Sequence, residues 1–261
     1  MMLLDKRKRF FLSSAILTAL SVWIQNTGDV KTKFIGIGIL GIATIVAIWF
    51  SLREGLKSRT SILIFILPVY FSIGSALFWF LLPSSLLTRI VTPLIYAVVM
   101  YFLLLTQNVF SVSYIKTIAL FRAAKGVGFL LTLFTYFLVM DALISLRLSY
   151  LFLGPLVFIF TFPLTIQGLW TVTLDKKFNR HLLVMATIIS YVQSQVAIIL
   201  FFWPVGVVVG SLFLTIIYYI VLGLGHNELD GRLFPQTVRE YLTIGVVVFL
   251  VMLFSTSWNG T

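Results

Sequence analysis

Residues 34–52 read FIGIGILGIATIVAIWFSL, an apolar run that holds no charged side chain. A helix rises about 1.5 Å per residue, so a run of this length nearly crosses a hydrocarbon core of about 30 Å. Further apolar runs recur along the whole chain, with short connections between them. The sequence therefore predicts an all-α, polytopic bundle of transmembrane helices. The nine predicted spans are 10–25, 34–52, 61–82, 86–106, 126–146, 148–173, 182–203, 205–225 and 241–257.

The composition excludes an ordinary soluble domain. Hydrophobic residues make up 60% of the chain, charged residues only 10%, and the mean hydropathy is +1.09. Soluble domains carry about 25% charged residues, so lipid must cover much of this surface. The net charge of +11 comes from Lys and Arg in short connections, a pattern typical of topology signals and of anionic-lipid contacts rather than nucleic-acid binding. The absence of cysteine excludes disulfides and thiolate chemistry.

The distribution of basic residues predicts the orientation. If the N-terminus is cytoplasmic, the inner connections hold all but four of the 19 Lys and Arg residues. The four on the outside are Lys31, Lys33, Arg89 and Arg147. This bias predicts nine spans with the N-terminus inside and the C-terminus outside. An eight-span arrangement, with one run lying in the interface, is the alternative.

The chain is predicted to form a single transmembrane domain over 1–261. Within it, 109–125 is interpreted as a basic amphipathic helix on the cytoplasmic face, or as an extension of the fourth or fifth span. The segment 226–240 is interpreted as a polar cytoplasmic loop, and a metal site there has too few ligands. Basic side chains of the cytoplasmic face are predicted to contact anionic lipids. They are Lys116, Arg122, Lys125, Lys176, Lys177, Arg180, Arg232 and Arg239.

The seventh predicted span holds the densest polar cluster at mid-membrane depth. Ser190, Gln193 and Ser194 share one helical face at spacings of three and four residues, while Gln195 points elsewhere. Buried amides in a membrane cost free energy unless they are paired. Two interpretations stay open: hydrogen bonds that join helices, or a hydrated cavity for a polar solute or a lipid headgroup.

The sixth predicted span contains two prolines, Pro155 and Pro163, close to polar side chains. Proline frees a backbone carbonyl and bends a membrane helix, so a kink there either lines a site or is stabilised by threonines of the same helix. We combine the two spans into one candidate ligand site. Its residues are Thr161, Thr165, Gln167, Ser190, Gln193 and Ser194.

Two glycine motifs and one acidic residue lie inside predicted spans. The G-x-G-x-x-G of 36–41 lies inside an apolar span, so it predicts helix packing rather than nucleotide binding. Gly206 and Gly210 form a G-x-x-x-G packing face, within the chain or between chains. Asp141 is the one acid inside a predicted span, and we expect an interfacial salt bridge to Arg89 or Arg147, or an ion-coupling role.

No catalytic signature is present. The sequence lacks D-D-x-x-D, H-E-x-x-H and G-x-S-x-G, so it points to no catalytic residue, metal or cofactor and favours a non-enzyme. Three stretches, 116–124, 202–204 and 233–241, resemble uncharacterised multi-span membrane proteins of candidate-phylum bacteria. The resemblance implies a bacterial cytoplasmic membrane and carries over no activity.

The functional prediction follows from these features. We predict small-solute transport, or lipid binding and handling, through a polar site between the sixth and seventh spans. The alternative is a structural or assembly subunit that docks other membrane proteins or copies of itself. The expected partners are membrane lipids, anionic on the cytoplasmic face.

Overall fold

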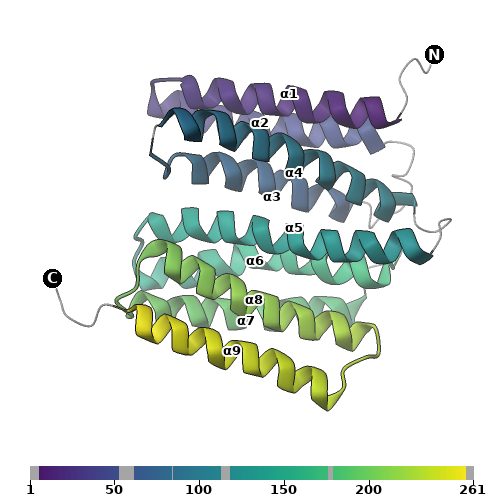
Figure 1. The fold of residues 1–261 in the computed structure, drawn as a ribbon, viewed down its shortest axis with the longest axis vertical. Coiled ribbons are helices and arrows are strands. Elements are labelled where there is room, and N and C mark those ends of the chain that lie inside the picture. The colour runs from purple at the N-terminus through teal and green to yellow at the C-terminus, as the bar shows by residue number, and fades with distance from the viewer. Residues whose placement is uncertain (1–5, 53–61, 84, 113–117, 176–178, 257–261) are drawn as a thin grey trace. The chain divides into compact units, whose positions relative to one another are not determined.

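The computed structural model describes residues 6–52, 62–83, 85–112, 118–175 and 179–256. Over these residues all regular structure is helical, as the sequence predicted (Figure 1). The helices are α1 (Lys6–Asn26), α2 (Val30–Leu52), α3 (Leu63–Trp79), α4 (Leu86–Val112), α5 (Ile118–Ser145), α6 (Tyr150–Thr173), α7 (Arg180–Phe201), α8 (Val207–Leu229) and α9 (Pro235–Ser255).

Seven of the described helices are long and apolar enough to cross a membrane: α2 and α4 to α9. The other two fall short for different reasons. Helix α3 has only 17 residues. Helix α1 has 21 residues but is less apolar, and it begins with four basic side chains, Lys6, Arg7, Lys8 and Arg9. A multi-pass membrane protein is therefore confirmed, while the count of nine spans and their orientation stay predictions.

Several helices extend beyond the predicted apolar runs. Helix α4 continues to Val112, and α5 already begins at Ile118, so the described parts of 109–125 belong to these two helices. The polar segment 226–240 is divided between the end of α8 and the start of α9, which leaves only 230–234 as a connection. Hydropathy marks where the lipid contact of a helix ends, whereas backbone hydrogen bonding continues into the polar region.

The contacts divide the chain into two compact units, Met1–Leu131 and Thr132–Thr261, with the boundary inside α5. In the first unit α1 packs on α2, α2 on α3, α3 on α4, and α4 returns to α1, which closes a ring of four helices. Hydroxyl groups connect the helices inside this ring. Thr44 of α2 donates to Ser72 of α3 at 2.8 Å, and Ser72 lies 2.9 Å from the hydroxyl of Tyr96 on α4.

The glycine motif of α2 serves helix packing, as predicted. A Cβ atom at Gly36 would approach Ile24 of α1 to 2.8 Å, and one at Gly41 would approach Ile73 of α3 to 3.3 Å. Gly38 has open space instead. Two of the three glycines therefore let α2 lie close to its neighbours.

In the second unit α6 and α7 form the most extensive contact, and α8 packs against both. Gly154 permits the close approach of α6 to α7, because a Cβ atom there would meet Ile198 at 2.7 Å. Helix α9 packs on α8, where the hydroxyl of Tyr241 lies against Gly223. Gly210 is buried near Ile144 of α5, whereas Gly206 is exposed, so one half of the predicted G-x-x-x-G face is used within the chain.

Candidate functional site

The predicted polar face of α7 is buried inside the second unit. Gln193 is fully buried, while the neighbouring Gln195 is exposed, as the helical spacing predicted. In the orientation that satisfies both ends of the Gln193 amide, its Oε1 accepts from the backbone N–H of Tyr218 at 2.9 Å. Its Nε2 then lies 3.3 Å from the carbonyl of Leu214 and 3.1 Å from the hydroxyl of Tyr136. One side chain of α7 thus joins α5 and α8.

Two tyrosines fill the space next to this amide. The rings of Tyr136 and Tyr218 stack with centroids 4.1 Å apart, and both side chains are fully buried. Thr165 of α6 donates to the carbonyl of Thr161 and lies 3.2 Å from the hydroxyl of Tyr218. Tyr136, Thr165, Gln193 and Tyr218, here termed the polar node, bring α5, α6, α7 and α8 together through hydrogen bonds and ring stacking.

The remaining predicted site residues divide into two groups. Ser194 donates to the carbonyl of Gly154 at 2.8 Å, so it joins α7 to α6. Gln167 and Ser190 are at most 1% exposed, and within the described residues their polar side-chain atoms have no hydrogen-bond partner. Buried polar groups without partners are rare and costly. Thr161 is also fully buried, so the structure places all six predicted residues in the interior of the second unit.

Asp141 has a different partner from the predicted arginines. Its carboxylate is 2% exposed and accepts a hydrogen bond of 2.8 Å from Ser211 of α8. The contact crosses from α5 to α8 and lies in the second unit. Arg147 is exposed in the connection after α5, with a positive φ of 47°. The acid is therefore a further polar contact between the helices of this unit.

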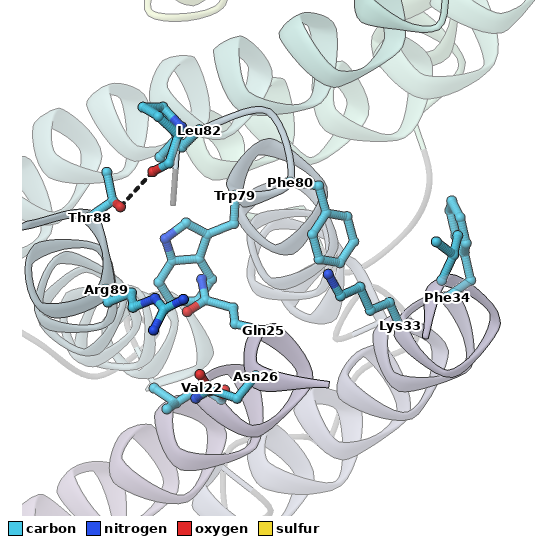
Figure 2. A pocket seen from close by; sticks show the side chains of 12 residues that line it. Val22, Gln25, Asn26, Lys33, Phe34, Trp79, Phe80, Leu82, Thr88 and Arg89 are labelled. Atoms are coloured by element: carbon cyan, nitrogen blue, oxygen red, sulfur yellow. Dashed lines mark hydrogen bonds between the residues drawn. The ribbon is translucent and has the colours of Figure 1, made fainter. Parts of the chain in front are cut away.

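A second polar region lies at one end of the first unit, where α1 and α3 end and α2 and α4 begin. It is an open pocket of about 550 Å³, here termed the helix-end pocket (Figure 2). All its walls come from the four-helix ring. The lining residues are Val22, Gln25, Asn26, Val30, Lys33, Phe34, Trp79, Phe80, Leu82, Pro83, Thr88 and Arg89.

The charges of the helix-end pocket are all positive. Lys33 and Arg89 line it together with no carboxylate, and neither side chain forms an ion pair with any residue that the structure describes. In Figure 2 the two cations extend from opposite sides, with Trp79 and Gln25 between them. The Lys33 amine lies 5.2 Å from the centre of the Phe80 ring, a cation–π distance that positions it at the wall.

The walls of the helix-end pocket are fixed by local hydrogen bonds. Thr88 at the start of α4 donates to the carbonyl of Pro83 at 2.7 Å, the bond drawn in Figure 2. Asp29 caps the start of α2 by accepting from the side chain and the backbone N–H of Thr32. These hydrogen bonds, the side-chain bond first, hold the pKa of the Asp29 carboxyl below its ordinary value of 3.8.

The predicted anionic-lipid contacts are distributed over both units. Arg122 is exposed and Lys125 half-buried in the first unit, and the Lys125 amine lies 5.0 Å from the Phe121 ring. Arg180, Arg232 and Arg239 are exposed in the second unit. Lys116, Lys176 and Lys177 lie outside the described residues. Among the described residues no group of three or more potential metal ligands occurs.

Sequence reasoning missed the tyrosines of the polar node and the helix-end pocket. Tyr136 and Tyr218 are the polar side chains that complete the hydrogen bonds of Gln193 and Thr165, and a tyrosine deep inside an apolar run was the available signal. Lys33 was interpreted only as a topology signal, and Arg89 as a topology signal and a possible ion-pair partner of Asp141. Their position beside Trp79 and Phe80 at the ends of predicted spans was the signal for a shared pocket.

Among the described residues, seven helices are long and apolar, and buried hydroxyl and amide groups join the helices inside each unit. These features define a polytopic α-helical membrane protein. The match to a family model over residues 17–255 covers most of the sequence. The chain therefore belongs to the DUF5656 family, described as a protein family of unknown function. No curated protein and no solved structure matches the chain.

Proposed function

We propose that this membrane protein binds an amphiphilic ligand in the helix-end pocket. Of the predicted functions, the proposal favours lipid binding or handling over transport of a small solute. The observation that carries the proposal is a pocket of about 550 Å³ between the ends of four helices. Binding sites for small ligands commonly have volumes of about 300–1,000 Å³ and combine apolar walls with a few polar groups. Helix ends in a membrane protein lie at the level of the lipid headgroups.

The lining favours an amphiphile over a purely polar solute. Val30 and Phe34 line the helix-end pocket and are 64% and 59% exposed, so the apolar wall continues onto the lipid-facing side of α2. Gln25 and Thr88 lie on the same walls and supply polar groups. An acyl chain can therefore lie along α2 while a polar headgroup occupies the pocket, which is the lateral opening that lipid handling requires.

Photo-cross-linking in nanodiscs tests this proposal. Full-length protein is reconstituted with a phospholipid that carries a photoreactive group near the headgroup, and labelled peptides are mapped by mass spectrometry. We expect labelling concentrated on 22–34 and 79–89. Equal labelling of all helix ends would mean ordinary lipid contact and would overturn the proposal.

A second candidate is a polar-solute site in the second unit, and one observation favours it. Gln167 and Ser190 are buried without hydrogen-bond partners among the described residues. If a solute or ordered water satisfies these groups, apolar replacement lowers stability; if nothing does, the same replacement raises it. Gln167→Met and Ser190→Ala, compared by melting temperature in the same detergent, separate the two cases. Higher melting temperatures for both variants would contradict the hypothesis of a solute site.

A further inference from the structure

We propose that the ligand of the helix-end pocket carries an anionic phosphate group, held between Lys33 and Arg89. This inference rests on the proposed function, because it names the chemical class of ligand for the same pocket. The primary observation is charge: two cations line the pocket, no carboxylate does, and neither cation has an ion-pair partner among the described residues. Two like charges that share a partly apolar pocket repel each other, and a bound anion removes that cost.

The remaining polar groups of the helix-end pocket also favour an anion. The indole N–H of Trp79 and the amide of Gln25 line it, and neither has a hydrogen-bond partner within the described part of the chain. The hydroxyl of Thr88, by contrast, already donates to Pro83. The groups left available are thus mainly donors, and a ligand rich in acceptor oxygens matches them.

The two cations supply complementary geometry for a phosphate. Arginine offers a planar fork that binds two oxygens at once, and lysine acts as a compact point charge. Arg89 comes from the start of α4 and Lys33 from the start of α2, so an anion between them connects two helices of the ring. The contact of Lys33 with Phe80 restricts the amine before a ligand arrives, which lowers the entropic cost of binding.

A binding experiment on the full chain in detergent tests the inference. Native mass spectrometry measures binding of three probes: short-chain phosphatidylglycerol, short-chain phosphatidylcholine and inorganic phosphate. We expect phosphatidylglycerol to bind best, because the choline ammonium of the zwitterionic lipid meets two cations. Lys33→Gln and Arg89→Gln are each expected to weaken phosphatidylglycerol binding by about tenfold or more.

Lys31→Gln is the matched control. Lys31 lies two residues from Lys33 and is exposed, but it does not line the helix-end pocket. Unchanged binding in this variant, together with weaker binding in the two pocket variants, supports the phosphate site. Equal weakening in all three would show diffuse attraction between charges and would overturn it. Arg89→Lys, which keeps the charge but loses the fork, is expected to bind with intermediate strength and serves if Arg89→Gln does not fold.

The probes separate failure of this inference from failure of the proposed function. In one outcome, both lipids bind equally well, the cross-linking labels the helix-end pocket, and the Lys33 and Arg89 substitutions leave lipid affinity unchanged. The amphiphile pocket then stands and the phosphate site is wrong. If inorganic phosphate binds with the expected dependence on Lys33 and Arg89 while neither lipid binds, the anion site stands and the amphiphile proposal is wrong. Absence of binding by all three probes overturns both.

Discussion

The helix-end pocket of the first unit and the polar node of the second unit both contain several polar side chains. They differ in whether those side chains have partners on neighbouring helices. In the polar node, the amide of Gln193 and the hydroxyl of Thr165 find partners on neighbouring helices. In the helix-end pocket, Lys33 and Arg89 have no ion-pair partner in the described chain. Polar groups satisfied by protein stabilise a fold, whereas polar groups left available at an opening are suited to bind a ligand.

Removing a ring from the polar node should have the largest effect on stability. Tyr136→Ala deletes a fully buried ring that stacks on Tyr218 at 4.1 Å. Replacement of a buried large aromatic side chain by alanine costs about 3–5 kcal/mol through lost contacts and a cavity. We expect a comparable loss in the free energy of unfolding, measured by reversible denaturation in mixed micelles. Tyr191→Ala, at a side chain that is 59% exposed, is the control and should change little.

Loss of the central amide should have the next largest effect. Gln193→Leu keeps the size of the side chain but leaves the hydroxyl of Tyr136 and the carbonyl of Leu214 without this partner. We expect a loss of about 1–3 kcal/mol, seen as a lower melting temperature. Gln195→Leu on the same helix removes an exposed amide and should leave the melting temperature unchanged. If the two variants have the same melting temperature, the amide of Gln193 does not stabilise the packing of α5, α7 and α8.

The cations of the helix-end pocket should contribute little to folding. Neither Lys33→Gln nor Arg89→Gln breaks an ion pair among the described residues, so the free energy of unfolding should change by less than about 0.5 kcal/mol in Arg89→Gln. Lys33→Gln also removes the contact with the Phe80 ring, so its loss should stay below about 1 kcal/mol. The measurement is thermal unfolding of ligand-free protein. A large loss in either variant would mean that this end of the ring is held together by its charges, and the contrast with the polar node would disappear.

The smallest effect should come from the Asp29 cap in acid. Because the pKa of Asp29 is lowered on folding, its stabilising contribution is present above the ordinary value of 3.8 and is lost as the pH falls through the lower folded value. Wild type should therefore lose slightly more stability below that pH than Asp29→Asn, which still caps α2 but does not titrate. Identical acid profiles for the two proteins would contradict this role.

Much of the fold could be predicted from hydropathy and periodicity. Each of the nine apolar runs contains a helix, because a buried or lipid-facing segment must satisfy its backbone hydrogen bonds internally. The burial of Gln193 and the exposure of Gln195 followed from the 3.6-residue period. Helix ends were less accurate: α5 begins before Gly126, since Arg122 and Lys125 are compatible with a helix that leaves the hydrocarbon.

The candidate sites could be predicted only in part. The sequence assigned Thr165 and Gln193 to one cluster, but their partners Tyr136 and Tyr218 come from helices that no local pattern connects to them. The helix-end pocket depends on the closure of a four-helix ring, which brings Lys33 and Arg89 to the same opening. Such long-range proximity is a property of packing and not of spacing along the chain.

The peripheral position of α9 has a consequence for biogenesis. Helix α9 packs on α8 through Tyr241 and Gly223, while the polar node is formed by residues of α5 to α8. Tyr136, Thr165, Gln193 and Tyr218 all precede Pro235 in the chain, so every residue of the polar node is synthesised before the first residue of α9. The hydrogen bonds and ring stacking of the polar node therefore involve no residue of the last helix and can form before that helix is made.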